Sequence, residues 1–255
     1  MRILSIAFAV SIAMISLQPI GPATAQGQSL TSNPETTTLS TTEVPQEHNY
    51  EGQDLQGADF TGQDLRGANF NGADLTNAIL TDANLEGATF RGTRMQSANF
   101  TNTNLKRTDF TDAIAFKSNF EGARFIGAHL QNVFFDKANL KKAHFEDVFA
   151  QWCSFGYAEL DGATIMTADF SNAFFPNTSL TYATFRDTTF IGTNFYDVDL
   201  SEVTGNFTDA YYNGGTKFAG FTDETNGEPY PGMKLRPDDE WTVFFESWAH
   251  RYPLN

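Results

Sequence analysis

The residues of this chain that could do chemistry are scattered, and no two of them have the spacing of a reactive pair. His129 and His144 lie 15 residues apart, and Cys153 is the only cysteine. The sequence shows no nucleophile–base signature, no glycine-rich phosphate loop and no His-x-x-x-His pair. A single cysteine excludes an intramolecular disulfide and the multi-cysteine zinc patterns. The sequence therefore predicts neither an enzyme nor a cofactor or metal site.

Acidic and amide side chains recur at a fixed interval in the first half of the chain. The first members of this series are Asp54, Asp59, Asp64, Asn69 and Asp74. Carboxylates are ligands for Ca²⁺, but no segment has ligands at EF-hand-like spacing. At this spacing we interpret them as the solvated position of a repeat and not as an acid/base pair.

Charge and composition exclude further classes. The chain has 255 residues, with 31 Asp and Glu against 16 Lys and Arg, so its formal net charge is −15. An ordinary nucleic-acid binder needs basic side chains to displace phosphate counterions, and an anionic membrane surface attracts the same side chains. The 25 Phe residues indicate a large core, which a disordered acidic chain would lack.

The elements that must position these side chains follow from a period of five. Every fifth residue from 55 to 200 is apolar, and 26 of these 30 residues are Leu or Phe, the exceptions being Met95, Ala115, Ala150 and Ile165. The residue two places earlier is Ala in 17 of the 30 units, and Cys153 occupies one of these small positions, where an inert buried thiol is expected. At Ala150 we expect local underpacking, with insertion of Phe149 as the alternative.

This period predicts a coil that winds around its own core. Two inward residues separated by one outward residue form a very short strand, and the two remaining residues, often polar and then Gly, form a turn. Apolar residues at i and i+5 do not share a face of an α-helix. Successive coils would pair their backbones, which gives an all-β parallel solenoid.

The units Ala58-Asp59-Phe60-Thr61-Gly62 and Ala68-Asn69-Phe70-Asn71-Gly72 resemble the A-(D/N)-L-x-x signature of pentapeptide-repeat proteins. The resemblance covers about 51–200. It implies a right-handed quadrilateral parallel β-helix with four units per coil, hence about 7.5 coils, and we assign 49–204 to this domain. Within the family, the chain resembles the exported and thylakoid-lumen members, which are common in cyanobacteria.

The two ends of the chain differ from the repeat. Residues 1–25 have a positive n-region, an apolar segment and the small-x-small site Ala23-Thr24-Ala25, which is typical of a cleaved signal peptide, and a membrane anchor is the alternative. Residues 26–48, rich in Thr, Ser, Gln and Pro, are expected to be a disordered linker. Residues 205–255 are expected to form an irregular wrap and a short C-terminal helix over 237–250.

That helix carries aromatic residues at i, i+3, i+4 and i+7, which is an amphipathic stripe. We expect it to cap the last coil around Phe195 and Leu200, and a binding role for its aromatics is the alternative. The stripe residues are Trp241, Phe244, Phe245 and Trp248.

A second aromatic set lies outside the core positions, on one face of the predicted coil. We expect this stripe to bind a partner or a second copy of the chain; the alternative is that its side chains lie flat over the turns or are covered by the linker or the C-terminal wrap. Its residues are Phe116, Phe134, Trp152, Tyr157, Phe174 and Tyr196.

Two functions compete on these grounds. The first is a non-catalytic exported module that binds an as yet unidentified protein partner or forms a homodimer in the periplasm or thylakoid lumen, without nucleic acid and without membrane contact after signal cleavage. The second rests on the resemblance, since some acidic pentapeptide-repeat proteins mimic DNA and inhibit gyrase. The predicted signal peptide favours the first, because gyrase is cytoplasmic.

Overall fold

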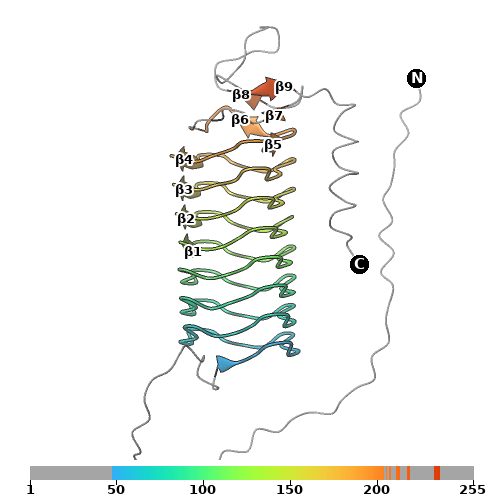
Figure 1. Ribbon diagram of the computed structural model, residues 1–255, viewed down its shortest axis with the longest axis vertical. Coiled ribbons are helices and arrows are strands. Elements are labelled where there is room, and N and C mark those ends of the chain that lie inside the picture. The colour runs from blue at the N-terminus through green and yellow to red at the C-terminus, as the bar shows by residue number, and fades with distance from the viewer. Residues whose placement is uncertain are drawn as a thin grey trace, which may run out of the picture. The chain divides into compact units, whose positions relative to one another are not determined.

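The computed structural model describes residues 48–203 without a break, and beyond them 205, 207, 211–212, 217–218 and 233–235 (Figure 1). The predicted signal peptide over 1–25 and all of the predicted linker except its last residue lie outside the described residues. So does the predicted helix over 237–250, with Trp241, Phe244, Phe245 and Trp248.

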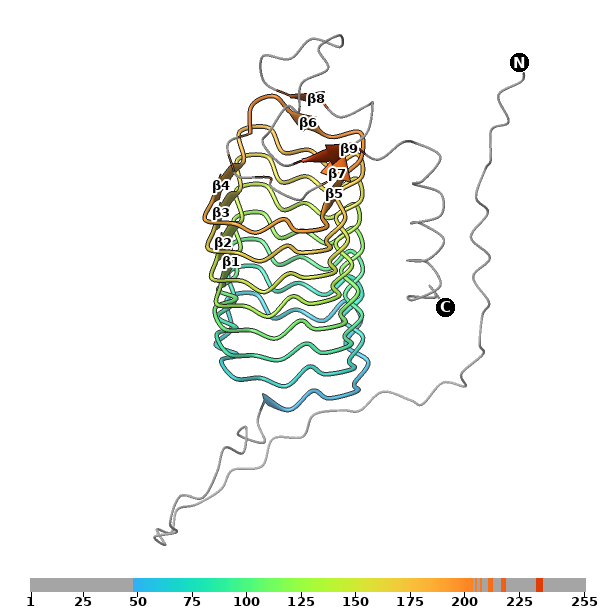
Figure 2. The ribbon, with the colours of Figure 1, turned by 45° about the horizontal axis from the view of Figure 1, so that its top comes forward.

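A stack of coils forms because each outward residue pairs with the residue twenty places further along the chain. Asp54 bridges Asp74 in parallel, Asp59 bridges Ile79, and the same register holds up to Phe174 and Asn194. Bridges recur every five residues, so four bridge ladders run along the described stack (Figures 1 and 2). At the start of the described stack, the His48 carbonyl accepts the Asn69 N–H at 3.0 Å.

Each corner is a tight turn, which keeps the strands very short. The N–H of Ala58 donates to the Leu55 carbonyl at 3.0 Å, closing a four-residue turn. The third turn residue, Gly57, has φ of 66°, which a type II turn requires and which costs glycine nothing. Asn77 takes the same place with φ of 60°, consistent with the tolerance of Asn for this region.

Where pairing extends beyond one residue, short parallel strands appear in three sheets. The first sheet runs β1-β2-β3-β4, the second β5-β7-β9 and the third β6-β8. The strands are β1 (Arg124–Ile126), β2 (His144–Glu146), β3 (Thr164–Met166), β4 (Thr184–Arg186), β5 (Asn194–Phe195), β6 (Asp199–Leu200), β7 (Tyr211–Tyr212), β8 (Lys217–Phe218) and β9 (Lys234–Leu235).

The end of the repeat differs from the irregular wrap that the sequence predicts. Strands β7, β8 and β9 continue the parallel ladders after the five-residue period stops. Phe207 and Met233 are buried, and the Phe207 ring stacks on Phe190 at 5.1 Å. Because the last regular coil would otherwise leave unpaired N–H and C=O groups, pairing continues without the repeat pattern.

The core consists of columns of aromatic rings. The rings of Phe135, Phe155 and Phe175 stack at centroid distances of 5.2 and 4.6 Å, and Phe195 follows at 5.2 Å. Rings of neighbouring columns meet edge to face, as for Phe120 and Phe135 at 5.6 Å. Both arrangements are favourable for aromatic pairs.

The small inward positions accept hydroxyl and thiol groups because backbone carbonyls lie within reach. Thr93 Oγ1 donates to the Phe70 carbonyl at 2.7 Å, and Cys153 Sγ donates to the Leu130 carbonyl at 2.7 Å. These buried groups are therefore satisfied inside an apolar core. Ala150 is buried, and Phe149 remains 46% exposed, so the alternative in which Phe149 inserts beside Ala150 is wrong.

Candidate functional site

The outward side chains on one face of the solenoid form a row that we call the 154 ladder. Each member forms a parallel bridge with the next, from one coil to the next. The members are Ile114, Phe134, Ser154, Phe174 and Asn194. The row continues past the repeat, because Asn194 pairs with Tyr211 of β7 and Tyr211 pairs with Lys234 of β9.

The six aromatics predicted to form a stripe occupy three positions of the five-residue unit. Phe134 and Phe174 belong to the 154 ladder, whereas Phe116 and Tyr196 directly follow a core residue. Tyr157 lies at a corner with φ of 57°, as does Trp152 with φ of 63°. Trp152 and Tyr157 lie five residues apart and therefore at different corners of the coil, so the stripe is a band of four columns and not a single row of rings.

Lysine side chains join part of this band. Lys137 Nζ lies 5.6 Å from the ring centroid of Phe116 and 5.9 Å from that of Tyr157, and Lys117 Nζ lies 5.3 Å from Phe116. A cation over an aromatic face is attracted by the ring quadrupole. The structure thus brings Phe116 and Tyr157 together through Lys137.

Exposure along the band is uneven, and one predicted member is buried. Tyr157 is 60% exposed, and Phe116, Phe134, Trp152 and Tyr196 are partly buried. Phe174, which the sequence analysis placed in this outward stripe, is only 3% exposed.

The burial of Phe174 extends to its neighbours in the ladder. Ser154 is 1% exposed and Asn194 is fully buried, although both occupy an outward register. The same register on another face is open to solvent at Arg124 and Thr184. The register alone therefore does not explain the burial.

Two polar groups on this face carry an energetic cost. Asp136 accepts a hydrogen bond from Ser154 Oγ at 2.8 Å, yet burial raises the pKa of Asp136 above its ordinary value. Among the residues that the structure describes, neither side-chain polar atom of Asn194 has a hydrogen-bond partner. The sequence pattern treats both residues as ordinary outward positions and gives no signal for either.

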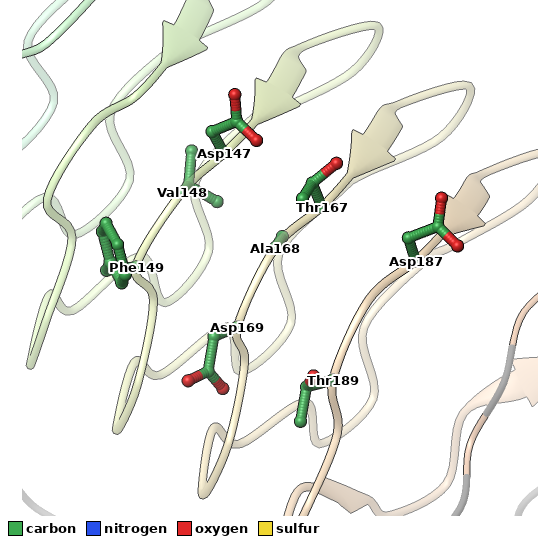
Figure 3. Close-up of a pocket in the computed structure, with 8 residues that line it drawn as sticks. All are labelled: Asp147, Val148, Phe149, Thr167, Ala168, Asp169, Asp187 and Thr189. Carbon is green, nitrogen blue, oxygen red and sulfur yellow. The ribbon is translucent and has the colours of Figure 1, made fainter.

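A hollow between three coils lies on a different face (Figure 3). Three carboxylates from successive coils line it, but Asp169 already accepts hydrogen bonds from Gln151 Nε2 at 2.6 Å and from the Ser171 N–H at 2.9 Å. No group of three or more His, Cys, Asp or Glu among the described residues could hold a metal ion. The lining residues are Asp147, Val148, Phe149, Thr167, Ala168, Asp169, Asp187 and Thr189.

The other residues singled out for chemistry are separated by the fold. His129 stacks on Phe149 at 5.2 Å, whereas His144 Nε2 lies 3.1 Å from Glu146 Oε2 in β2, in another ladder. Cys153 is fully buried, and burial raises the pKa of its thiol far above the usual range. A thiol in that setting stays protonated and unreactive.

The acidic series has a structural role that the sequence analysis missed. Asp59 Oδ1 accepts the N–H of Thr61 at 2.9 Å and the Thr61 hydroxyl at 2.6 Å, and these hydrogen bonds lower the pKa of Asp59. Asp74 accepts the Thr76 N–H in the same way at 3.0 Å. Asp and Asn favour turns through this local bond, which could have been expected from their position before each corner.

Basic side chains interrupt the acidic surface. Ion pairs join the outsides of neighbouring coils, so the acids do not form an unbroken row of charge. Three such pairs are Arg91–Asp109 at 2.9 Å, Lys141–Glu159 at 2.6 Å and Arg107–Glu86 at 3.3 Å.

Short parallel strands stacked at twenty-residue intervals around a continuous apolar core define a parallel β-solenoid, a class of repeat protein. A family model described as pentapeptide repeats matches more than half of the chain, in eight copies over 51–82, 78–114, 118–156 and 168–204. The chain therefore belongs to the pentapeptide-repeat family, whose members are generally structural or interaction modules.

Solved structures of other pentapeptide-repeat proteins are similar to this chain. HetL, involved in heterocyst differentiation regulation in the cyanobacterium Nostoc sp. strain PCC 7120, is 22% identical over 68% of this chain and 87% of its own, with a TM-score of 0.40. QnrB1, a plasmid-mediated fluoroquinolone resistance protein, is 16% identical over 77% and 94%, with a TM-score of 0.48. A protein of the Arabidopsis thaliana thylakoid lumen is 23% identical over 58% and 71%, with a TM-score of 0.22.

Curated proteins were compared as well, and none matches this chain. Within the residues that the structure describes, no helix is long and apolar enough to span a membrane.

Proposed function

We propose that this protein is an exported, non-catalytic module that binds another protein through the outside of its solenoid. The observation that carries the proposal is the set of aromatic side chains held outside the core, of which Tyr157 is 60%, Tyr182 72% and Phe149 46% exposed. Exposed aromatic side chains are typical anchors of protein interfaces. A regular stack of coils holds them at fixed positions on rigid backbone.

The proposal includes finer features of the fold and the location. The solenoid is a right-handed, four-sided coil of about 7.5 turns, as the family resemblance implies, and the twenty-residue register supports four units per turn. Residues 1–25 direct the chain to the periplasm or thylakoid lumen and are then removed. A second copy of this chain is a candidate partner beside an unrelated protein.

Two measurements test this proposal. N-terminal sequencing of the protein recovered from cell fractions should find Gln26 first, in the periplasmic or luminal fraction; an intact Met1 in the cytoplasm would contradict export. For binding, the variant with Phe149, Tyr157 and Tyr182 changed to Ser should lose the partner that purifies with the parent. A matched variant with Arg124 and Thr184 changed to Ser should retain it, and loss in both or in neither would contradict the aromatic anchors.

A further inference from the structure

The first coil, blue in Figure 1, differs from every later coil at its small inward positions. Among the thirty repeat units this position is glutamine only at Gln53 and Gln63. One coil later the same positions are Ala73 and Ala83, which are buried, whereas both glutamines are exposed. We propose that these two glutamines close the open end of the solenoid and prevent a second copy of the chain from pairing its backbone there.

The ladder carbonyls of the first coil point away from the stack. In the second coil, the carbonyls of Asn69 and Ile79 each accept an N–H of the first coil at 2.7 Å. The corresponding carbonyls of the first coil belong to Asn49 and Asp59, and no backbone N–H among the described residues donates to them. Free carbonyls at the edge of a sheet are a template for pairing with another chain.

The side-chain amides of the two glutamines bind these free carbonyls. Gln53 Nε2 donates to the Asn49 carbonyl at 3.1 Å, and Gln63 Nε2 donates to the Asp59 carbonyl at 3.3 Å. Each amide therefore takes the place that the N–H of a preceding coil would occupy. A further strand would have to displace both amides before it could pair, and the bonds that it gained would only replace bonds already made.

The apolar core is also less covered at this end. Leu55 and Ala58 are partly exposed, whereas Leu75 and Ala78, one coil later, are fully buried. Burial of this surface by a second copy would favour association through the end of the stack. The glutamines put polar amides on the end, where later coils have small apolar side chains.

Acidic side chains on the rim oppose the same association. Asp54 and Asp59 stand in the outward register, and neither has an ion pair among the described residues. Hydrogen bonds from Thr61 lower the pKa of Asp59, so this carboxylate stays charged at neutral pH. Two first coils that met end to end would bring like charges together. The amides and the acids then leave the sides of the stack as the surface that a partner can reach.

Sedimentation velocity of the full chain tests the proposal. Gln53→Ala with Gln63→Ala gives the first coil the residue that later coils have at this position. In 1 M NaCl, where the Debye length is only about 3 Å, the rim acids contribute little. We expect this variant to associate beyond the parent's own state, and we expect the parent to keep that state at about tenfold higher concentration, because only the variant has both carbonyls free.

The matched control changes two outward glutamines. Gln56 Nε2 donates to Asp74 Oδ2 of the second coil at 3.3 Å, and Gln96 Oε1 accepts the Thr76 hydroxyl at 3.2 Å, so neither closes the end. Gln56→Ala with Gln96→Ala should sediment like the parent. Circular dichroism should give the parent's β spectrum for both variants.

Hydrogen exchange shows where the variant associates. The N–H groups of Asp54, Asp59 and Asp64 have no acceptor among the described residues, so they should exchange quickly in the parent. In the associated variant we expect their exchange to slow about tenfold or more, because pairing at the end protects them.

Three results would overturn the inference. A folded variant that sediments like the parent in 1 M NaCl would show that the glutamines do not prevent pairing. Equal association of the control variant, or slowed exchange that spares the first coil, would place the new contact elsewhere. If the Ala variant does not fold, Gln53→Thr with Gln63→Thr takes its place under the same criteria, since Thr93 and Thr103 show that the inward position accepts Thr.

Discussion

At the scale of single residues, Asn194 illustrates how an outward position can become an interior one. Its side chain is fully buried in β5, between Phe174 and β7 in the ladder, and both of its polar atoms lack a hydrogen-bond partner within the described part of the chain. A buried polar group without a hydrogen bond costs about 1–3 kcal/mol, and an apolar group of similar shape avoids that cost.

We therefore expect Asn194→Leu to stabilise the protein by about 1 kcal/mol, seen as a rise of a few degrees in the thermal midpoint. The matched change Asn139→Leu should not stabilise, because Asn139 is partly exposed and its Oδ1 accepts the Lys141 N–H at 3.1 Å. A lower midpoint for Asn194→Leu would show that its amide is hydrogen-bonded in solution.

Asp136 leads to a prediction about how the stability of the protein depends on pH. Burial raises its folded pKa, so the folded protein binds the proton more readily than the unfolded chain. Stability is then lost as the pH rises from the ordinary Asp pKa of about 3.9 through the raised folded value. Asp136→Asn keeps the acceptor for Ser154 Oγ, and we expect it to stabilise the protein at pH 7 but not below the ordinary pKa.

Denaturant unfolding at several pH values measures this difference. Asp59 serves as the control, since its hydrogen bonds from Thr61 lower its pKa and any effect of Asp59→Asn should appear as a loss of stability at neutral pH. A constant difference between Asp136→Asn and the parent at all pH values would show that burial of the carboxylate is not its cause.

At the scale of the repeat element, the inward positions are those where folding constrains the type of residue most strongly. Phe120 is fully buried, and its ring stacks on Phe100 at 4.7 Å. A buried carboxylate without a partner costs several kcal/mol, comparable to much of a domain's stability of about 5–15 kcal/mol. We expect Phe120→Asp to abolish the cooperative melting transition in circular dichroism.

Asn119 is the matched control for that change. Asn119→Asp keeps an acceptor for the Glu121 N–H, which Asn119 Oδ1 accepts at 3.0 Å, and the side chain points outward. The melting temperature of Asn119→Asp should be close to that of the parent protein. An unchanged transition for Phe120→Asp would contradict the inward assignment of this position.

The sequence predicts the repeat well because the five-residue period is local. A large residue at Phe120 and a small one at Ser118 point the same way wherever they occur in an extended chain, so the core follows without knowledge of the rest. The burial of Phe174 and Asn194 is not predicted by the repeat, because the same outward register is exposed on another face at Arg124 and Thr184. The pairing of β5 with β7 likewise joins segments that share no repeat.

At the scale of the whole molecule, charge alone does not make a mimic of DNA. The net charge is −15, but ion pairs such as Lys141 with Glu159 interrupt the acids at the surface. A partner that binds phosphate rows requires closely spaced negative charge.

We therefore expect the mature chain from Gln26 onward to leave DNA gyrase supercoiling unchanged at concentrations where a DNA mimic inhibits. A gel-based supercoiling assay at two salt concentrations checks this, since inhibition through charge should weaken as salt increases. Salt-sensitive inhibition would favour the DNA-mimic function over the interaction module.

The twenty-residue register has a consequence for the gene. An in-frame duplication or loss of twenty codons adds or removes one whole coil and leaves every later residue in its original ladder. A change of five codons preserves the inward and outward alternation but moves each later side chain to the neighbouring ladder. A protein with such a change between Phe134 and Ser154 would keep the same core, but the outward residues that now form one row on this face would be divided between two ladders. A change in length therefore keeps every row of outward residues intact only when it adds or removes a whole coil.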